Sequence, residues 1–316
     1  MRSLAKGCGR NFLYWSHLEA KSIQTYRRQL HRFVAWCKAR GVEVLRLGDK
    51  DRVDLLFGRY VHRRFRQFGG LQRTYVQHAY SALITERPEL KGFLPRSAKS
   101  LASWKKIVPS KQYPPLPYEI LLVFAWEAQR QGNFAVMVAF LVAWGAYLRV
   151  SEVCALRWED VVIFGEKATA VLAGVQDSKG ARGDTQNAVL NGAKVVRLLK
   201  RWKRSQPRSR PRDSVFRLSS VQLNAFISVC VAKYGLKSCG FVFHSVRHGR
   251  ASFDLGRKVS VETIVVRGRW GSVKSARRYF QAGQVILTAI ARRCRGVMAL
   301  GRLLRRGAFG RLFALG

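Results

Sequence analysis

Side chains that could act together on a phosphodiester lie between residues 242 and 281. His244 and Arg247 are three positions apart, so a helix would place them on one face. Trp270 and Tyr279 follow in the same stretch. A guanidinium and hydrogen-bond donors can hold the charge that develops on non-bridging phosphate oxygens, while a phenol can attack phosphorus. This grouping predicts nucleophilic chemistry on a phosphodiester, with Tyr279 as the nucleophile. The alternative is that Tyr279 is an ordinary half-buried tyrosine in a basic helix.

A second arginine lies upstream, in the segment WGAYLRVSEVCALRWED at residues 144–160. Arg149 follows a very apolar run, where a charge is costly unless it has a partner or a purpose. Glu152, one helical turn later, could orient it, and a purely structural Arg149–Glu152 pair is the alternative. A planar guanidinium offers parallel donors to phosphate oxygens, so Arg149 and Arg247 are predicted to bracket the phosphate.

These segments, in this order, resemble the boxes of the tyrosine recombinase (phage integrase) family. The segment around Arg149 resembles the first arginine box, HSVRH at residues 244–248 resembles the H-x-L-R-H box, and the segment ending at Tyr279 resembles the nucleophile box. The resemblance implies a 3′-phosphotyrosyl link, release of a 5′-hydroxyl, and no metal ion, ATP or other cofactor. It also implies double-stranded DNA as the substrate and a homotetramer on paired DNA sites.

The resemblance also assigns the remaining site residues. His244 would donate to the phosphate or assist proton transfer, and His248 would orient or pack beside it. Trp270 stands where most members have the His of an L-G-H box, and an indole N–H can donate a hydrogen bond but cannot move a proton. Lys179, on a turn between strands, would be the general acid for the leaving 5′-oxygen. Lys167 in the preceding turn is the rival, and a mobile surface lysine is the structural alternative.

The charge of the chain points to a polyanionic partner. A net charge of +40, from 58 basic and 18 acidic residues, predicts nucleic acid, with an acidic membrane surface as the competing partner. Arg27 and Arg28 on the first predicted helix are candidate DNA contacts. So is the basic run at residues 197–212, although a solvated charge run is the alternative. The candidates in that run are Lys200, Arg201, Lys203 and Arg204.

The sequence favours an intracellular protein without a membrane span. The most apolar run, residues 134–148, is shorter than the roughly 18–20 residues that cross a bilayer, so a buried core helix is expected. The N-terminus lacks the apolar core of a secretory signal. The six cysteines form no C-x-x-C and are expected to be reduced thiols, with a structural disulfide as the alternative. No metal-ligand cluster has plausible spacing. The expected location is with DNA, in a nucleus or in the bacterial cytoplasm.

The hydrophobic pattern predicts a mainly α fold with a small antiparallel sheet. Helical patterns at about residues 22–40, 53–68 and 71–85 lie in an all-helical domain over residues 1–107, which resembles the family's core-binding domain. A proline-rich linker follows at 108–117, and an α+β catalytic domain at 118–284. A basic amphipathic tail at 285–316 could pack on its own domain, on a neighbouring protomer or on a membrane surface.

The leading hypothesis is a site-specific DNA recombinase or integrase. A type IB topoisomerase shares nearly the same catalytic groups, but its corresponding box usually lacks the histidine that His244 provides here. A non-catalytic, mobile-element-derived DNA-binding protein is the rival from another class, and the intact set of Arg149, His244, Arg247 and Tyr279 disfavours it. A basic ribosomal or chromatin protein would explain the charge but not the boxes.

Overall fold

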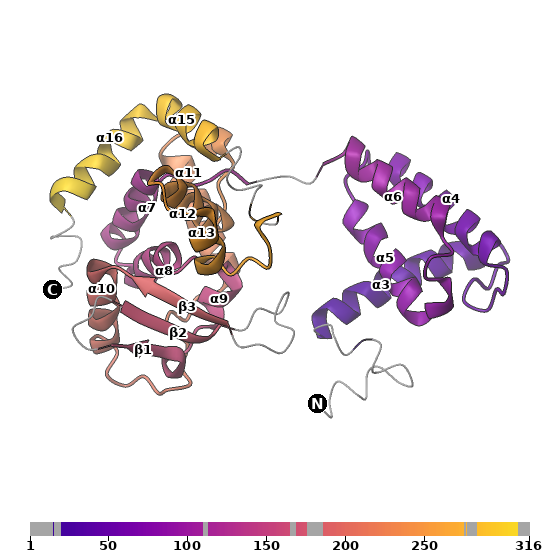
Figure 1. The fold of residues 1–316 in the computed structure, drawn as a ribbon, viewed down its shortest axis with the longest axis horizontal. Helices are drawn as coiled ribbons and strands as arrows, with labels where there is room; N and C mark the ends of the chain where they lie inside the picture. Colours follow the sequence, from indigo (N-terminus) through magenta and orange to yellow (C-terminus); the bar gives the residue numbers. More distant parts are fainter. Residues whose placement is uncertain are drawn as a thin grey trace. The chain divides into compact units, whose positions relative to one another are not determined.

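The computed structural model describes residues 15, 20–109, 113–164, 169–175, 186–274, 276 and 283–308. The chain divides into two compact units, Met1–Lys111 and Gln112–Gly316 (Figure 1). Each unit has its own hydrophobic core. The described part is mainly helical, with one small antiparallel sheet, which confirms the predicted fold class. Among the described helices, none is long and apolar enough to cross a membrane.

The first unit is helical throughout its described regular structure. It comprises α3 (Ala20–Lys38), α4 (Lys50–Gln67), α5 (Arg73–Glu86), the 3-10 turn η2 (Pro88–Leu90) and α6 (Pro95–Ile107). The predicted helices correspond to α3, α4 and α5, with ends that differ by a few residues. Sequence analysis named no separate helix for α6, which begins with a proline in its first turn, where the missing N–H costs no helical hydrogen bond.

A buried carboxylate joins two of these helices. Asp54 on α4 accepts hydrogen bonds from the backbone N–H groups of Arg96 and Ser97, each at 2.9 Å, and from the Ser97 hydroxyl at 2.6 Å. The first N–H groups of a helix lack partners within the helix, so the carboxylate satisfies them at the start of α6. Asp54 therefore fixes where α6 begins against α4.

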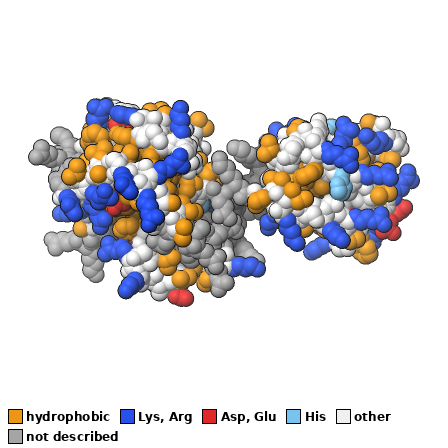
Figure 2. Space-filling view, turned by 90° about the horizontal axis from the view of Figure 1, so that it is seen from above, with side chains coloured by type: hydrophobic (Ala, Val, Ile, Leu, Met, Phe, Trp, Pro, Cys, Tyr) orange, Lys and Arg blue, Asp and Glu red, His pale blue; other side chains and the backbone are white. Residues whose placement is uncertain are grey.

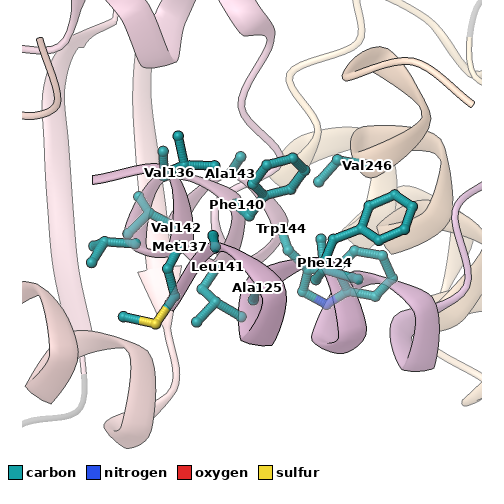
Figure 3. Close-up of a cluster of buried hydrophobic side chains, with 14 of the residues drawn as sticks. Phe124, Ala125, Val136, Met137, Phe140, Leu141, Val142, Ala143, Trp144 and Val246 are labelled. Atoms are coloured by element: carbon teal, nitrogen blue, oxygen red, sulfur yellow. The ribbon is translucent and has the colours of Figure 1, made fainter. Parts of the chain in front are cut away.

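The core of the second unit is built around the predicted apolar helix. α8 (Phe134–Gly145) follows α7 (Tyr118–Arg130), and every α8 residue from Val136 to Gly145 is buried. Figure 3 shows its side chains packed with Phe124 and Ala125 of α7 and with Val246. A helix that is apolar on all sides is stable only when it is enclosed. The prediction of a buried core helix at this run is confirmed.

A three-stranded antiparallel sheet, in the order β1-β2-β3, lies in the same unit. Its strands are β1 (Val161–Ile163), β2 (Thr169–Val175) and β3 (Gln186–Asn191). Val161 pairs with Leu172, and Val171 pairs with Val189. The predicted small sheet is therefore present. Lys167 and Lys179 fall in the β1–β2 and β2–β3 connections, outside the described residues.

The remaining helices are α9 (Val150–Ala155), α10 (Ala193–Arg204), α11 (Ser220–Lys233), α12 (His244–Gly256), α13 (Val261–Arg267), α15 (Gly283–Arg293) and α16 (Arg295–Leu303). Among them, α9 and α12 pack on α8, and α16 of the tail packs on α7. Short turns are η3 (Trp158–Asp160), η4 (Lys237–Cys239) and the π-helical η5 (Leu304–Ala308).

The described part of the basic tail packs on its own unit. α16 lies along α7 (Figure 1), with Met298 and Leu304 buried in the same core. Gly301 lies so close to the backbone of Glu119 that a β-carbon there would overlap the Glu119 carbonyl. Arg305 reaches the Glu119 carboxylate at 3.4 Å. In this single chain, residues 295–305 of the tail therefore pack on the second unit itself.

Two thiols meet where the tail joins this core. Cys239 at the end of η4 and Cys294 before α16 place their sulfur atoms 3.9 Å apart. The five described cysteines, at positions 37, 154, 230, 239 and 294, are free thiols, and Cys8 lies outside the described residues. Burial and the neighbouring Cys294 raise the pKa of the Cys239 thiol to about 11.

We predict that the oxidant diamide joins Cys239 and Cys294 in an intramolecular disulfide. The thiolate is the attacking species, so the raised pKa makes this reaction slower at pH 7 than at pH 9. Mass spectrometry of non-reduced peptides measures the linked pair, and Cys239→Ser is the control that must lack it. Failure to find the linked peptide at either pH would contradict the close sulfur contact.

A buried glutamate joins α7 to α11. Glu127 accepts hydrogen bonds from the Lys233 ammonium at 2.7 Å, the Tyr234 hydroxyl at 3.0 Å and the Gln131 amide at 2.8 Å. Burial alone would raise the pKa of Glu127, but these donors outweigh it and lower the pKa to about 2. The ionised carboxylate therefore stabilises the fold above the unfolded-state pKa, and this stabilisation is lost as the pH falls towards 2.

Glu127→Gln is expected to lower the free energy of unfolding by about 2 kcal/mol at pH 7. Because protonation removes the same charge from the wild type, the difference should shrink between about pH 4.5 and pH 2. Urea unfolding followed by circular dichroism across this range tests the expectation. Glu262→Gln, at an exposed position on α13, is the control, and an equal loss at every pH would contradict the charge-based explanation.

Candidate active site

α12 carries the H-x-x-R pair, and Arg247 is its most constrained cation. Arg247 is only 1% exposed. Its Nη1 donates to the carbonyl of Tyr147 at 2.8 Å, and its Nη2 donates to the carbonyl of Gly268. The guanidinium also lies 4.8 Å from the centre of the Trp270 ring. These contacts fix the guanidinium between the turn before Arg149 and the turn before Trp270.

Arg149 and Glu152 start α9 as a reciprocal cap. Arg149 is the N-cap residue, and its backbone N–H donates to Glu152 Oε2 at 2.7 Å. The Arg149 Nη1 donates to Glu152 Oε1 at 2.6 Å. One carboxylate therefore holds both the backbone and the side chain of Arg149, so the direction of its guanidinium is set by the start of the helix.

Glu152 is also the meeting point of two further arginines. Arg269 Nη2 donates to Glu152 Oε2 at 2.6 Å, and Arg247 Nη1 lies 3.9 Å from the same oxygen. We call Arg149, Arg247 and Arg269 around Glu152 the arginine cluster. Its three guanidiniums meet one carboxylate whose side chain is 1% exposed. Buried charges need compensation, so the carboxylate of Glu152 holds these three side chains close to one another.

The members of the arginine cluster differ in access to solvent. The side chain of Arg149 is 25% exposed, whereas those of Arg247 and Arg269 are 2% and 5% exposed. Arg149 is therefore the member of the cluster that solvent can reach, and the other two guanidiniums are buried. Figure 2 shows Lys and Arg side chains over the visible face of each unit, among scattered Asp and Glu.

The two histidines of the H-x-x-R-H segment have different surroundings. His244, half-buried at the start of α12, meets His248 edge-on, with 4.4 Å between ring centres. His248 is 7% exposed, and its Nδ1 donates to the carbonyl of Tyr113 at 3.0 Å. The backbone N–H of Leu116 also donates to the carbonyl of Ser245 at 2.9 Å. His248 thus ties α12 to residues 113–117, the last part of the predicted linker, which is a packing and orienting position.

A close backbone approach holds this segment against α12. A β-carbon at Gly249 would overlap the carbonyl of Leu116 and the ring of Trp144. Only glycine fits between these groups without displacing one of them, so Gly249 allows residues 113–117 to lie directly on α12.

Trp270 covers the inner side of Arg247. Its ring meets the Tyr147 ring edge-on, with 6.0 Å between centres and 89° between planes. Gly268 has no room for a β-carbon, which would overlap the six-membered ring of Trp270. The indole therefore packs over the Gly268 backbone whose carbonyl holds Arg247.

Tyr147 and Asp254 form a buried pair that sequence analysis did not identify. The Tyr147 hydroxyl donates to Asp254 Oδ2 at 2.6 Å, and Arg250 Nε donates to the same oxygen at 3.0 Å. Burial and this carboxylate raise the pKa of Tyr147, which keeps its phenol neutral and disfavours it as a nucleophile. The signal in the sequence that could have pointed to Asp254 was its spacing, because a residue two turns after Arg247 lies on the same face of α12.

The structure thus brings Arg149, Glu152, Arg247 and Trp270 together and places His244 on the same helix as Arg247. Tyr279 and Lys179 lie outside the described residues, as does Lys167. Arg269 was not predicted, because the sequence-based assignment concerned only its neighbour Trp270. Among the described residues, no group of His, Cys, Asp and Glu is arranged to hold a metal ion.

The predicted DNA-contact residues lie on helices other than α9 and α12. Lys200, Arg201, Lys203 and Arg204 are on α10, where Lys203 lies 5.6 Å from the centre of the Trp158 ring. Arg27 and Arg28 belong to α3 of the first unit. Arg28 is exposed, whereas Arg27 is half-buried and its guanidinium lies 5.4 Å from the centre of the Trp15 ring.

Glu152→Gln is expected to lower the free energy of unfolding by about 3 kcal/mol, because it leaves three guanidiniums without their shared carboxylate. Chemical denaturation at neutral pH measures the loss. Glu159→Gln is the matched control, since Glu159 belongs to an exposed pair with Arg157 and such pairs contribute little. Equal stability of Glu152→Gln and the wild type would show that the cluster does not depend on this carboxylate.

Comparisons with known proteins identify the family of the chain and its fold. The sequence model of the phage integrase family matches residues 126–284, which is half of the chain. A search of curated proteins gave no match. The fold is similar to three recombinase structures at low sequence identity, so these comparisons concern the fold alone.

The first is the XerH site-specific recombinase bound to palindromic difH substrate, with 16% identity, a TM-score of 0.59, and coverage of 85% of this chain and 79% of that one. A lambda integrase dimer bound to a COC′ core site has 15% identity, a TM-score of 0.55, and coverage of 83% and 89%. The Tn1549 transposon integrase with circular intermediate DNA has 15% identity, a TM-score of 0.53, and coverage of 82% and 94%. This chain belongs to the phage integrase family and is a tyrosine recombinase.

Proposed function

We propose that this recombinase cuts and rejoins double-stranded DNA at specific sites through a covalent bond between Tyr279 and the DNA 3′-phosphate. The arginine cluster carries the proposal, because it concentrates positive charge behind the partly exposed Arg149. The fold neighbours support DNA as the substrate, since XerH and lambda integrase are seen with DNA sites.

In the proposed reaction, the Tyr279 oxygen attacks phosphorus and the bond to the 5′-oxygen breaks. The phenol loses its proton, and the leaving oxygen gains one to become a 5′-hydroxyl. A free phenol has a pKa of about 10, so only about one in a thousand is ionised at neutral pH. The surrounding cations would favour the phenolate, and Lys179, or Lys167, would protonate the leaving oxygen.

The remaining residues would act on the phosphate. Arg149 would bind non-bridging oxygens directly. Arg247 would stabilise the negative charge of the phosphate from its buried position. His244 and the Trp270 indole N–H would donate hydrogen bonds, with His248 keeping α12 in position. Rejoining is the same reaction in reverse, with a 5′-hydroxyl as the nucleophile, so the phosphodiester bond energy is conserved.

The other basic surfaces would hold the duplex. The first unit would bind DNA as a core-binding domain through Arg28 and neighbouring basic residues on α3, and α10 would contact the phosphate backbone. The proline-rich linker at residues 108–117 would allow the units to close on a duplex. Strand exchange between two duplexes would require a homotetramer. Phosphate contacts of this kind are sequence-independent and weaken as salt rises.

Covalent trapping tests this function. The protein is incubated with nicked suicide duplexes that carry its selected binding site, in EDTA, and separated on a denaturing gel. We expect a shifted protein–DNA band that Tyr279→Phe abolishes, because only the phenol oxygen can form the bond. Tyr234→Phe is the matched control and should keep the band. The Tyr234 hydroxyl donates a hydrogen bond to Glu127, which is not among the proposed catalytic residues.

Other outcomes distinguish the alternatives. A band that persists in Tyr279→Phe would contradict the assignment of the nucleophile. Relaxed plasmid without recombined product would indicate a type IB topoisomerase. Salt-sensitive DNA binding without any covalent band at the selected site would indicate a non-catalytic DNA-binding protein.

A further inference from the structure

Arg269 adopts a backbone conformation that few side chains tolerate. Its φ is 53°, in the left-handed region, where a β-carbon crowds the backbone and makes the conformation unfavourable. Glycine would adopt this turn without that cost. A long charged side chain here, only 5% exposed, therefore calls for an interaction that offsets the cost.

The Arg269 side chain spans the two segments that meet at the arginine cluster. Its Nη2 donates to Glu152 Oε2 at 2.6 Å, and its Nη1 donates to the carbonyl of Ala146 at 3.3 Å. Its guanidinium therefore joins the turn before Trp270 to the end of α8 and the start of α9. Glu152 Oε2 also accepts the backbone N–H of Arg149, so Arg269 and Arg149 share one oxygen.

The same oxygen lies near Arg247 without a hydrogen bond. Arg247 Nη1 is 3.9 Å from Glu152 Oε2, whereas Arg247 donates hydrogen bonds to the carbonyls of Tyr147 and Gly268. In a buried site, a carboxylate attracts a guanidinium strongly at this distance. Arg269 occupies Oε2 with a shorter, charge-assisted bond and thereby limits the pull of Glu152 on Arg247.

We propose that Arg269 is a positioning residue for the cleavage step: it holds Glu152 so that Arg149 stays directed at the phosphate and the positive charge of Arg247 is not offset by a close ion pair. The inference rests on the proposed function. Without Arg269, Glu152 would turn towards Arg247 and form a close ion pair with it. The positive charge of Arg247 would then be offset by Glu152 and would stabilise the phosphate less. Arg149 would lose Glu152 as the fixed partner of its side chain at the start of α9.

The test compares Arg269→Gly with Arg217→Gly. Both remove an arginine from a left-handed position, because Arg217 has a φ of 50°. Arg217 is a surface residue whose side chain is 67% exposed and pairs with Asp213 at 3.4 Å. Glycine therefore relieves the same kind of backbone strain in both variants, but only Arg269→Gly changes the arginine cluster.

The measured quantities are the single-turnover cleavage rate on a suicide duplex and DNA affinity by fluorescence anisotropy. Arg269→Gly should cleave about 10- to 100-fold more slowly, because small displacements of catalytic groups cost that much. Its affinity should stay within about 3-fold of the wild type, since Arg269 is almost inaccessible to DNA. Methylguanidinium, with sodium chloride as the ionic-strength control, should restore part of the rate. Arg217→Gly should cleave at the wild-type rate.

Other results would overturn the inference. An unchanged cleavage rate in Arg269→Gly would do so, and so would equal losses of rate and affinity with no rescue by methylguanidinium. Arg269→Lys keeps the charge and covers the case in which the glycine variant fails to fold. It should cleave faster than the neutral Arg269→Gln, and equal rates for these two would also refute the proposal.

A crystal structure of Arg269→Gly provides a readout that does not depend on activity. Glu152 Oε2 and Arg247 Nη1, now 3.9 Å apart, should approach to hydrogen-bond distance. An unchanged distance would refute the inference even if the wild type forms no covalent product. Absence of covalent product in the wild type itself would instead refute the proposed function.

Discussion

The carboxylate of Glu152 is the interaction on which the rest of the site depends. It caps α9 and orients Arg149. It also binds Arg269, which lies more than 100 residues later in the chain, in the turn before Trp270. Three guanidiniums therefore share one buried carboxylate, so the position of each depends on the direction in which Glu152 points.

That arrangement requires a rigid support, and the apolar α8 provides it. α8 ends at Gly145, directly before the turn that presents the carbonyls of Ala146 and Tyr147 to Arg269 and Arg247. α12 packs on α8 through Val246, one residue before Arg247 (Figure 3). The hydrophobic core and the charged cluster are therefore adjacent layers, and errors in packing one would displace the other.

Local patterns predicted much of this fold but only part of the site. The apolar run predicted α8, the alternation of short β-prone runs predicted the sheet, and the spacing of Arg149 and Glu152 predicted their pairing within one turn. Periodicity carries no signal for contacts between distant positions, such as Arg269 with Glu152 or Tyr147 with Asp254. Helix α6 was missed because its turn-rich surroundings and proline start weaken the helical pattern.

The bonds that hold residues 113–117 against α12 have a mechanical consequence. Tyr113 and Leu116 attach the chain to His248 and Ser245, at the end of the helix that carries His244 and Arg247. These residues are the last part of the predicted linker at residues 108–117, so that part is held on the second unit. A displacement of residues 113–117 would therefore act on the helix that carries His244 and Arg247 through these two hydrogen bonds.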